Sequence, residues 1–295
     1  LDALIQEVTL LSQSPVVNQR PLHYVYFGGG TPSYLSAQQL RDLMTRLREI
    51  FPWDSAREVT FECEPGTLQK HKLETLREMG ITRLSLGVEN FKPEILQFNG
   101  RAHLEDEIYR AYGWARELQF PQINIDLIAG MVGEDWDNWK VNVKKTLDLA
   151  PDTVTIYQME LPYNTVFSKE FRIIGQDDPV GSVADWPTKR AWVDYAFSEF
   201  EKAGYTVTSA TTAMKNTQTE FVYRDALWSG ADMFGTGVAS FGHLNGVHMQ
   251  NLDTWEAYIE KLNKGEIPLG RAFPLSNQDL FIRETVLLLK KGRLD

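Results

Sequence analysis

The chain has 295 residues, of which 43% are hydrophobic and 24% charged, and its formal net charge is −10. This length allows one large α/β domain or two smaller ones. The negative charge argues against nucleic acid or an anionic membrane as a partner for the whole surface. No apolar run approaches the roughly 20 residues that span a bilayer, and the start does not resemble a signal peptide, so we expect a cytoplasmic protein. The single cysteine, Cys63, excludes an internal disulfide and a multi-cysteine metal site within this chain.

Strand and helix patterns alternate along the first half of the chain. A helical pattern opens the sequence, and the strands are predicted at 24–27, 57–67, 82–91, 123–131 and 153–162. The helices between them are predicted at 36–50, 71–79, 104–118 and 135–149, the first of them capped by Ser36. Such repetition predicts parallel strands joined by right-handed crossovers, in an α/β barrel or a doubly wound sheet.

Polar and apolar residues alternate in three of these strands. The apolar members are Val59, Phe61, Cys63, Leu84, Leu86, Val88, Ile123, Ile125 and Leu127, and the polar members between them include Thr60, Ser85 and Asn124. Strands of a doubly wound sheet read as continuous apolar runs, and a closed eight-stranded barrel fills its interior with branched side chains. The pattern therefore favours a curved, incompletely closed barrel with a polar interior, whose site lies at the carboxyl ends of the strands.

Three consecutive glycines, Gly28 to Gly30, follow the first strand and precede Thr31 and Pro32. Glycine costs more backbone entropy than other residues, so three in a row indicate that something approaches the main chain closely or that unusual dihedral angles are needed. A strand that leads into a glycine-rich loop and then a helix is a common ligand-binding geometry. A tight turn between strand and helix explains this stretch equally well.

The regular alternation of strand and helix patterns ends after Thr165. Here the sequence predicts an aromatic-rich helix at 186–204, a strand at 205–211, glycine-punctuated turns at 221–246, and helices at 253–263 and 276–290. We expect residues 1–165 to form the barrel core and residues 166–295 to form an α/β extension packed on it. Four tryptophans are expected in the core rather than on a porphyrin-binding face; they are Trp186, Trp192, Trp228 and Trp255.

Several carboxylates and one guanidinium are predicted to face the barrel interior. These candidates are Glu62, Glu64, Glu89, Asp126, Glu160 and Arg101. Such a set suits a ligand that carries a positive charge together with a carboxylate, as an amino-acid-like sulfonium cofactor does. For Glu64 and Glu160 a solvated or salt-bridged strand end is the simpler interpretation.

Six stretches in the same order carry a family resemblance: FGGGTPS, FECEP, LGVENF, FNGRAH, NIDLIAGM and GTGVASFGH. Together they resemble the radical S-adenosylmethionine enzymes related to oxygen-independent coproporphyrinogen III oxidase. That group also includes haem chaperones and some methyltransferases and cyclopropanases. The resemblance runs through the whole chain and implies a partial, six-stranded TIM-like (β/α) barrel of the radical S-adenosylmethionine type, five of whose strands are visible here.

The resemblance also implies contacts with S-adenosylmethionine. Gly28, Gly29, Gly30 and Thr31 correspond to the motif that meets the amino group and methionyl part of the cofactor. Glu62 would hold polar groups of the cofactor, and Glu89 stands where the oxidase itself has Gln.

Further positions follow from the same resemblance. Arg101 would pair with the cofactor carboxylate, and Asp126 would accept hydrogen bonds from the ribose hydroxyls. The surroundings of Gln158 and the stretch with Ala239 and Ser240 would line the adenine side of the pocket. No catalytic residue is assigned, and none of the five histidines is assigned to a metal.

The family's CxxxCxxC loop, which holds a 4Fe-4S cluster, is missing from this chain. Cys63 does not replace it, because it is single and is predicted to be a buried core thiol. We expect that the loop and the first barrel strand precede Leu1 in a longer protein, and that this chain alone does not reduce the cofactor.

For the intact protein the resemblance implies an oxidoreductase of porphyrin biosynthesis that uses a 5′-deoxyadenosyl radical. Its substrate would be a small molecule, such as a tetrapyrrole, and its electron donor a protein such as flavodoxin or ferredoxin. Two alternatives on the same scaffold are a haem chaperone and a methyltransferase or cyclopropanase. A more distant alternative is a barrel glycoside hydrolase that uses Glu62 with Glu89 or Glu160.

Overall fold

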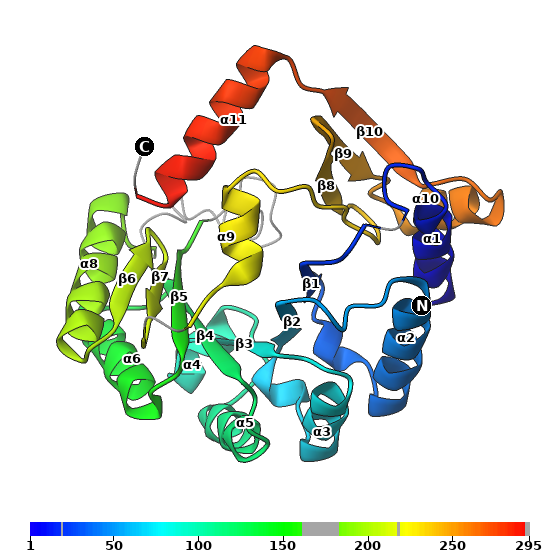
Figure 1. The fold of residues 1–295 in the computed structure, drawn as a ribbon. Coiled ribbons are helices and arrows are strands. Elements are labelled where there is room, and N and C mark those ends of the chain that lie inside the picture. The colour runs from blue at the N-terminus through cyan, green and yellow to red at the C-terminus, as the bar shows by residue number, and fades with distance from the viewer. Residues whose placement is uncertain (19, 161–182, 217–218, 293–295) are drawn as a thin grey trace, which may run out of the picture.

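A curved, mostly parallel sheet forms the centre of the molecule (Figure 1). The computed structural model describes residues 1–18, 20–160, 183–216 and 219–292. The seven strands lie in the order β1-β2-β3-β4-β5-β7-β6. The first five are parallel and confirm the predicted ones: β1 (Tyr24–Phe27), β2 (Glu58–Cys63), β3 (Arg83–Glu89), β4 (Gln122–Ala129) and β5 (Thr153–Gln158).

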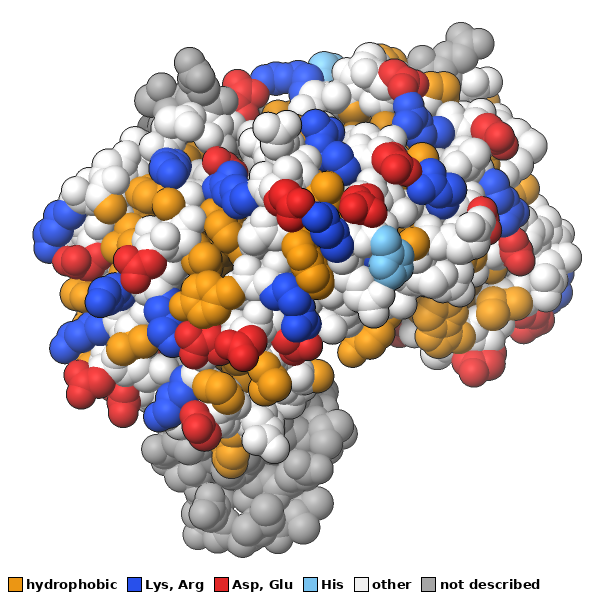
Figure 2. Space-filling view, turned by 90° about the horizontal axis from the view of Figure 1, so that it is seen from below, with side chains coloured by type: hydrophobic (Ala, Val, Ile, Leu, Met, Phe, Trp, Pro, Cys, Tyr) orange, Lys and Arg blue, Asp and Glu red, His pale blue; other side chains and the backbone are white. Residues whose placement is uncertain are grey.

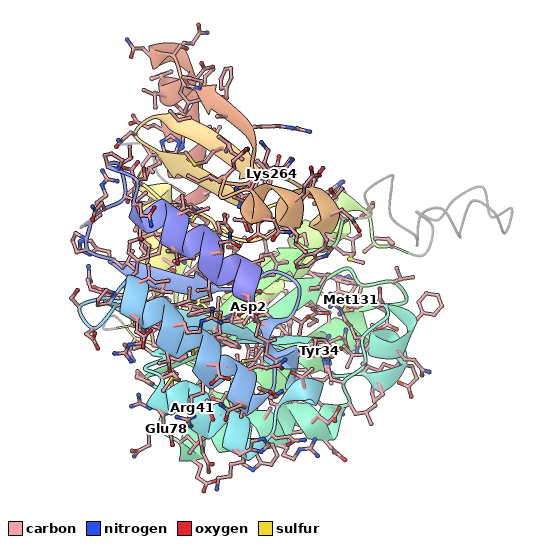
Figure 3. The ribbon with its side chains drawn as sticks, turned by 90° about the vertical axis from the view of Figure 1, so that its right-hand side faces the viewer. Asp2, Tyr34, Arg41, Glu78, Met131 and Lys264 are labelled. Carbon is pink, nitrogen blue, oxygen red and sulfur yellow. The ribbon has the colours of Figure 1, made fainter. Side chains whose placement is uncertain are left out.

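Helices cover the outer face of this sheet (Figure 1). They are α2 (Ala37–Ile50), α3 (Lys70–Glu78), α4 (Pro93–Phe98), α5 (Glu105–Glu117), α6 (Trp136–Leu149) and α8 (Trp186–Lys202). Ser36 caps α2 as predicted, because its hydroxyl accepts the Gln39 N–H at 3.2 Å and its own N–H donates to Gln39 at 2.9 Å. Figure 3 shows Arg41 of α2 beside Glu78 of α3, which form an ion pair on the surface of this layer. The sequence did not predict α4, a single short helix after β3.

The predicted alternation along the strands is confirmed. All nine apolar members on β2, β3 and β4 are buried against the helices. Cys63 is one of them, with 3% of its surface exposed, and burial raises the pKa of its thiol. It is therefore the predicted core thiol, and the polar members of the same strands face the concave side of the sheet.

The predicted strand at 205–211 is a hairpin that extends the barrel sheet. Strand β6 (Thr206–Ser209) pairs with β7 (Thr212–Met214), and β7 lies antiparallel to β5. The expected boundary between core and extension, at residues 165 and 166, lies outside the described residues. Both hairpin strands come from the second part of the chain and belong to the barrel sheet.

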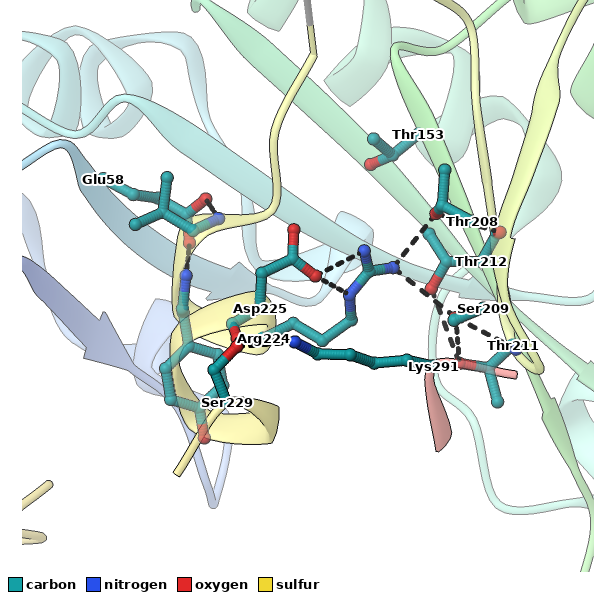
Figure 4. Close-up of polar contacts among 12 residues, drawn as sticks. Glu58, Thr153, Thr208, Ser209, Thr211, Thr212, Arg224, Asp225, Ser229 and Lys291 are labelled. Atoms are coloured by element: carbon teal, nitrogen blue, oxygen red, sulfur yellow. Dashed lines mark hydrogen bonds and ion pairs between the residues drawn. The ribbon is translucent and has the colours of Figure 1, made fainter. Parts of the chain in front are cut away.

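Polar contacts connect a short helix, α9 (Val222–Trp228), to two strands of the barrel sheet (Figure 4). Glu58, at the start of β2, accepts the N–H groups of Val222 and Tyr223 at 2.8 and 3.2 Å. Arg224 donates to Asp225 and, at 3.2 Å, to the hydroxyl of Thr208 on β6. The helix is thus tied to β2, next to one edge of the sheet, and to β6 at the other edge.

The last part of the chain forms a separate three-stranded antiparallel sheet. It consists of β8 (Phe241–Leu244), β9 (Val247–Asn251) and β10 (Leu269–Pro274), with helices α10 (Trp255–Asn263) and α11 (Asn277–Lys290). Helix α10, with Lys264 just after its end, lies over α1 (Asp2–Ser12), as Figure 3 shows. The sequence analysis predicted only turns at 221–246, which was wrong for α9 and β8. The Asn245–Gly246 pair, with φ of 48° and 74°, is the signal of a two-residue hairpin turn.

The expectation for the tryptophans is only partly met. Trp192 is buried, but Trp186 and Trp255 are 44% and 66% exposed because they lie in the first turns of α8 and α10. Trp228 is half-buried. Figure 2 shows acidic and basic side chains interspersed on the face seen from below. Among the described helices, none combines the length and apolar character needed to cross a membrane.

Candidate cofactor site

The glycine loop is forced close to the carboxyl end of β2. A Cβ on Gly28 would lie 2.6 Å from a ring carbon of Tyr26 and 2.8 Å from the carboxyl carbon of Glu62, so no side chain fits there. Gly29 has φ of +102° and Thr31 has φ of 56°, both in the left-handed region. Gly30 has open space around its Cα. The loop therefore presents bare backbone to the concave side. A tight turn between strand and helix does not by itself require this close approach to Tyr26 and Glu62, so a ligand-binding loop is the better interpretation.

Glu62 holds this loop in place. Its Oε1 accepts the hydroxyl of Tyr26 at 2.6 Å, and its Oε2 accepts the N–H of Gly29 at 3.0 Å. A carboxylate has about four lone-pair sites, so further donors can still bind it. Glu62 is thus both a support for the loop and a candidate acceptor for a ligand.

Three polar residues that the sequence analysis missed stabilise the chain just after the glycine loop: Ser33, Thr67 and Lys72. Ser33, in the 3-10 turn Pro32–Tyr34, contacts the Thr67 hydroxyl at 2.6 Å and accepts the N–H of Glu64 at 3.0 Å. The Lys72 ammonium donates to the carbonyls of Ser33 and Thr67 at 2.6 and 2.9 Å. Burial lowers the pKa of Lys72. This network connects the ends of β1 and β2, with Thr67 lying in the turn Pro65–Thr67.

Asp126 lies on the concave face of β4 among donors. Its carboxylate accepts from the hydroxyl of Ser85 at 2.7 Å and the amide of Asn124 at 2.8 Å. Burial, and to a smaller extent the nearby carboxylate of Glu62, raises the pKa of Asp126 to about 6, although its donors oppose this. The two donors orient the carboxylate and leave lone pairs for hydroxyl groups of a ligand.

Glu89 and Arg101, which the sequence suggested separately, form an ion pair. The Arg101 Nε lies 2.5 Å from Glu89 Oε2, and the Arg101 side chain is 40% exposed. Glu89 ends β3 with φ of 62°, a strained backbone for a glutamate. Burial raises its pKa to about 7, against the attraction of Arg101. Among the described residues we find no partner for the terminal nitrogens of Arg101, so they remain available to a carboxylate.

The remaining candidates lie in different surroundings. Glu64 pairs with His103, which confirms the interpretation as a salt-bridged strand end. Glu160 is exposed. On β5, Tyr157 pairs with Ile128, which shares a face of β4 with Asp126, so Tyr157 lies on the concave face and alternation turns Gln158 away from the carboxylates.

The GTGVASFG stretch approaches the glycine loop across a cavity of about 900 Å³. Its lining combines Gly28, Gly29 and Ser240 with apolar side chains of α1 and α2. Next to Ser240, Ala239 has φ of 60° and donates its N–H to the carbonyl of Leu252 at 2.8 Å. The same cavity borders β1, which pairs only with β2 among the described strands. One edge of β1 is therefore open.

These residues fit S-adenosylmethionine. The bare backbone of the glycine loop, the available nitrogens of Arg101 and the oriented carboxylate of Asp126 match its methionyl backbone, carboxylate and ribose hydroxyls. In the part of the chain that the structure describes, no group of three or more histidine, cysteine, aspartate or glutamate side chains could hold a metal ion. The described residues thus offer no ligands for an iron–sulfur cluster.

Comparison with known proteins places the chain in a family. The family model described as "Radical SAM superfamily" matches residues 13–145. An oxygen-independent coproporphyrinogen III oxidase of Synechocystis is 26% identical over 97% of this chain and 62% of its own length. The haem chaperone HemW of Lactococcus lactis is 29% identical over 88% of this chain and 66% of its own. The chain therefore spans somewhat less than two thirds of the length of these relatives.

The solved structure of coproporphyrinogen III oxidase (HemN) from Escherichia coli, described as a radical SAM enzyme, superimposes on the whole of this chain. The TM-score is 0.84 at 25% identity, and the match covers 69% of that structure. This confirms the predicted partial α/β barrel. The chain belongs to the radical S-adenosylmethionine superfamily, in the group that contains oxygen-independent coproporphyrinogen III oxidases and haem chaperones.

Proposed function

We propose that this chain is the cofactor-binding part of a radical S-adenosylmethionine oxidoreductase similar to oxygen-independent coproporphyrinogen III oxidase. The observation that carries the proposal is the convergence of the glycine loop, the Glu89–Arg101 pair and Asp126 at the carboxyl ends of neighbouring parallel strands. When bound and reduced by one electron, S-adenosylmethionine supplies a 5′-deoxyadenosyl radical, which abstracts hydrogen from an organic substrate. The substrate we favour is a tetrapyrrole.

The protein residues bind and orient the cofactor. The backbone at Gly29 and Gly30 receives the methionyl part, and Glu62 accepts hydrogen bonds from its amino group. The terminal nitrogens of Arg101 pair with the carboxylate while its Nε stays on Glu89. Asp126 accepts the ribose hydroxyls, using the lone pairs that Ser85 and Asn124 leave unoccupied.

The adenine lies, in this proposal, toward the end of β5 and the stretch that contains Ala239 and Ser240. Ser240 borders the cavity next to the glycine loop. Its hydroxyl donates to the carbonyl of Thr236 at 2.6 Å, so toward a ligand it serves as an acceptor. At the end of β5 it is Tyr157, on the same face of the sheet as Asp126, that borders this side of the site, and the neighbouring Gln158 points to the other face.

The cluster ligands come from a segment outside this chain. The open edge of β1 and the neighbouring cavity support this, because one more strand could pair there and bring a cysteine loop toward Gly28 and Gly29. The electron then comes from a protein such as flavodoxin or ferredoxin. The chain alone binds the cofactor without cleaving it.

A haem carrier on the same scaffold is the second candidate, because a relative named as a haem chaperone matches at 29% identity. Such a protein binds haem stoichiometrically and does not consume S-adenosylmethionine. A glycoside hydrolase is disfavoured, because the Glu62 carboxylate supports the glycine loop through Tyr26 and Gly29, and because that activity leaves the glycine loop and the GTGVASFGH stretch unexplained.

The deciding experiment uses the gene that encodes this chain together with the sequence upstream of it. The extended protein is reconstituted with iron and sulfide without oxygen, reduced, and assayed for 5′-deoxyadenosine with and without coproporphyrinogen III. We expect product from the extended protein and none from this chain alone. An upstream segment without a three-cysteine loop, or an extended protein that only binds haem, contradicts the proposal.

A further inference from the structure

The segment that carries Arg101 is a six-residue loop, 99–104, between α4 and α5. Its start is anchored to the loop after β4, because the Asn99 side chain donates to the carbonyl of Val132 and accepts its N–H, both at 3.0 Å. The N–H of Arg101 donates to the carbonyl of Leu96 at 2.9 Å. These hydrogen bonds fix the beginning of the loop at Asn99 and Arg101. They do not fix residues 102–104, which form its second half.

His103 anchors this second half. Its side chain is fully buried, with Nε2 3.0 Å from the carbonyl oxygen of Val88 and Nδ1 in contact with Oε1 of Glu64. A carbonyl oxygen only accepts, so Nε2 carries a hydrogen. The contact between Nδ1 and a carboxylate needs a second hydrogen, which the imidazolium supplies. Both ring nitrogens then donate, one to the end of β2 and one to β3.

The two partners of His103 lie at the ends of the strands that shape the site. Val88 directly precedes Glu89, whose left-handed backbone turns its carboxylate toward Arg101. His103 itself lies two residues after Arg101. One side chain therefore fixes the backbone on both sides of the Glu89–Arg101 ion pair. A merely space-filling residue at this position would need neither polar contact.

We infer that His103, as an imidazolium shared between Glu64 and Val88, is the positioning residue that holds Arg101 and Glu89 in place for the carboxylate of an amino-acid-like cofactor. The inference rests on the proposed function and deepens it. His103 does not touch the cofactor, and it acts through Arg101.

The pairing makes this arrangement dependent on pH. Burial alone would lower the pKa of His103, but the hydrogen bond and the charge of Glu64 outweigh burial and raise it above the ordinary 6.5. The other charged groups around the loop are Glu89, Arg101 and Glu107. When the imidazolium loses its proton, one of its two hydrogen bonds is lost. The affinity for the cofactor should therefore fall as pH rises through the raised pKa of His103.

The test measures binding of S-adenosylmethionine to this chain by titration calorimetry between pH 5.5 and 9. Variants are His103→Ala and Glu64→Gln, and the control is His71→Ala, an exposed histidine on α3. We expect His103→Ala to weaken binding at least tenfold at pH 7 and to remove the decline at high pH. Glu64→Gln keeps the side-chain volume and should move that decline to lower pH. His71→Ala should change nothing.

A double variant separates positioning from simple destabilisation. Because His103 acts through Arg101, the Arg101→Ala, His103→Ala pair should bind no more weakly than Arg101→Ala alone. Additive losses, or an unchanged pH profile in Glu64→Gln, overturn the inference. If the unmodified chain does not bind S-adenosylmethionine, the proposed cofactor site is wrong, whatever His103 does. Thermal melts of each variant show whether a loss of binding comes from a failure to fold.

Discussion

The hydroxyl of Tyr26 donates a 2.6 Å hydrogen bond to the carboxylate of Glu62 and thereby links β1 to β2 beneath the glycine loop. Burial, followed by the charge of Glu62, raises the pKa of the Tyr26 hydroxyl, so it stays a donor across the range in which proteins are studied. Tyr26 also packs against Tyr223 of α9, with ring centroids 4.4 Å apart. A residue from the second half of the chain thus packs beside this bond.

The bond predicts different effects for its two partners. Tyr26→Phe removes one donor but leaves the Gly29 N–H on Glu62, so binding of S-adenosylmethionine should weaken only a few fold, or about 1 kcal/mol. Glu62→Ala removes both contacts and should weaken binding more than tenfold. Calorimetric titration measures both, with the exposed Tyr34→Phe as control. Equal affinities for Glu62→Ala and the unmodified chain contradict this role.

Asp126 and Arg101 are expected to contribute directly to binding. Asp126→Ala and Arg101→Ala should each weaken binding of S-adenosylmethionine more than tenfold, which corresponds to about 1.4 kcal/mol, because each removes a charge-assisted contact. Arg110→Ala, which disturbs an exposed ion pair with Glu107, is the matched control. If neither variant binds more weakly than the control, the assignment of both residues is wrong.

The low-pH side of the binding profile should depend on two carboxylates. Asp126 and Glu89 have pKa values raised to about 6 and about 7, so both lose their protons as pH increases from 5.5 to 7.5. The carboxylate anions accept hydrogen bonds from the ligand more strongly than the neutral acids, so the affinity for S-adenosylmethionine should rise from pH 5.5 to 7.5. Because binding favours the anions, it should also release protons near pH 6. Titrations in buffers of different ionisation enthalpy count these protons. Asp126→Asn should reduce the release, and an unchanged count would contradict the assignment.

The three glycines are expected to differ in what they do. Gly28→Ala should destabilise the fold by about 1–3 kcal/mol, because the new Cβ collides with Tyr26 and Glu62. Gly30→Ala meets nothing within 4 Å, so its melting temperature should stay near that of the unmodified chain while cofactor binding weakens. Thermal melts and titrations of both variants test this contrast. A Gly30→Ala chain with normal affinity would show that no ligand approaches there.

The sequence was sufficient to predict the barrel and its polar interior, because strand side chains alternate with a period of two and the acidic residues recur at strand ends. It was not sufficient for contacts that depend on tertiary approach. The Glu64–His103 pair joins residues 39 positions apart, and nothing in the spacing of the histidines indicates it. Tyr157, rather than Gln158, faces the carboxylates, because the pairing of Tyr157 with Ile128 puts it on the same face of the sheet as Asp126. The hairpin at Asn245–Gly246 was predictable from its turn residues.

The backbone of Glu89 has a consequence for the balance between stability and function. A non-glycine residue in the left-handed region costs about 1–3 kcal/mol, and glycine avoids most of this cost. Glu89→Gly should therefore leave a chain that melts at the same or a higher temperature but has lost the partner of Arg101. At this position a more stable protein would be a poorer binder, so selection for folding alone would not keep a glutamate there.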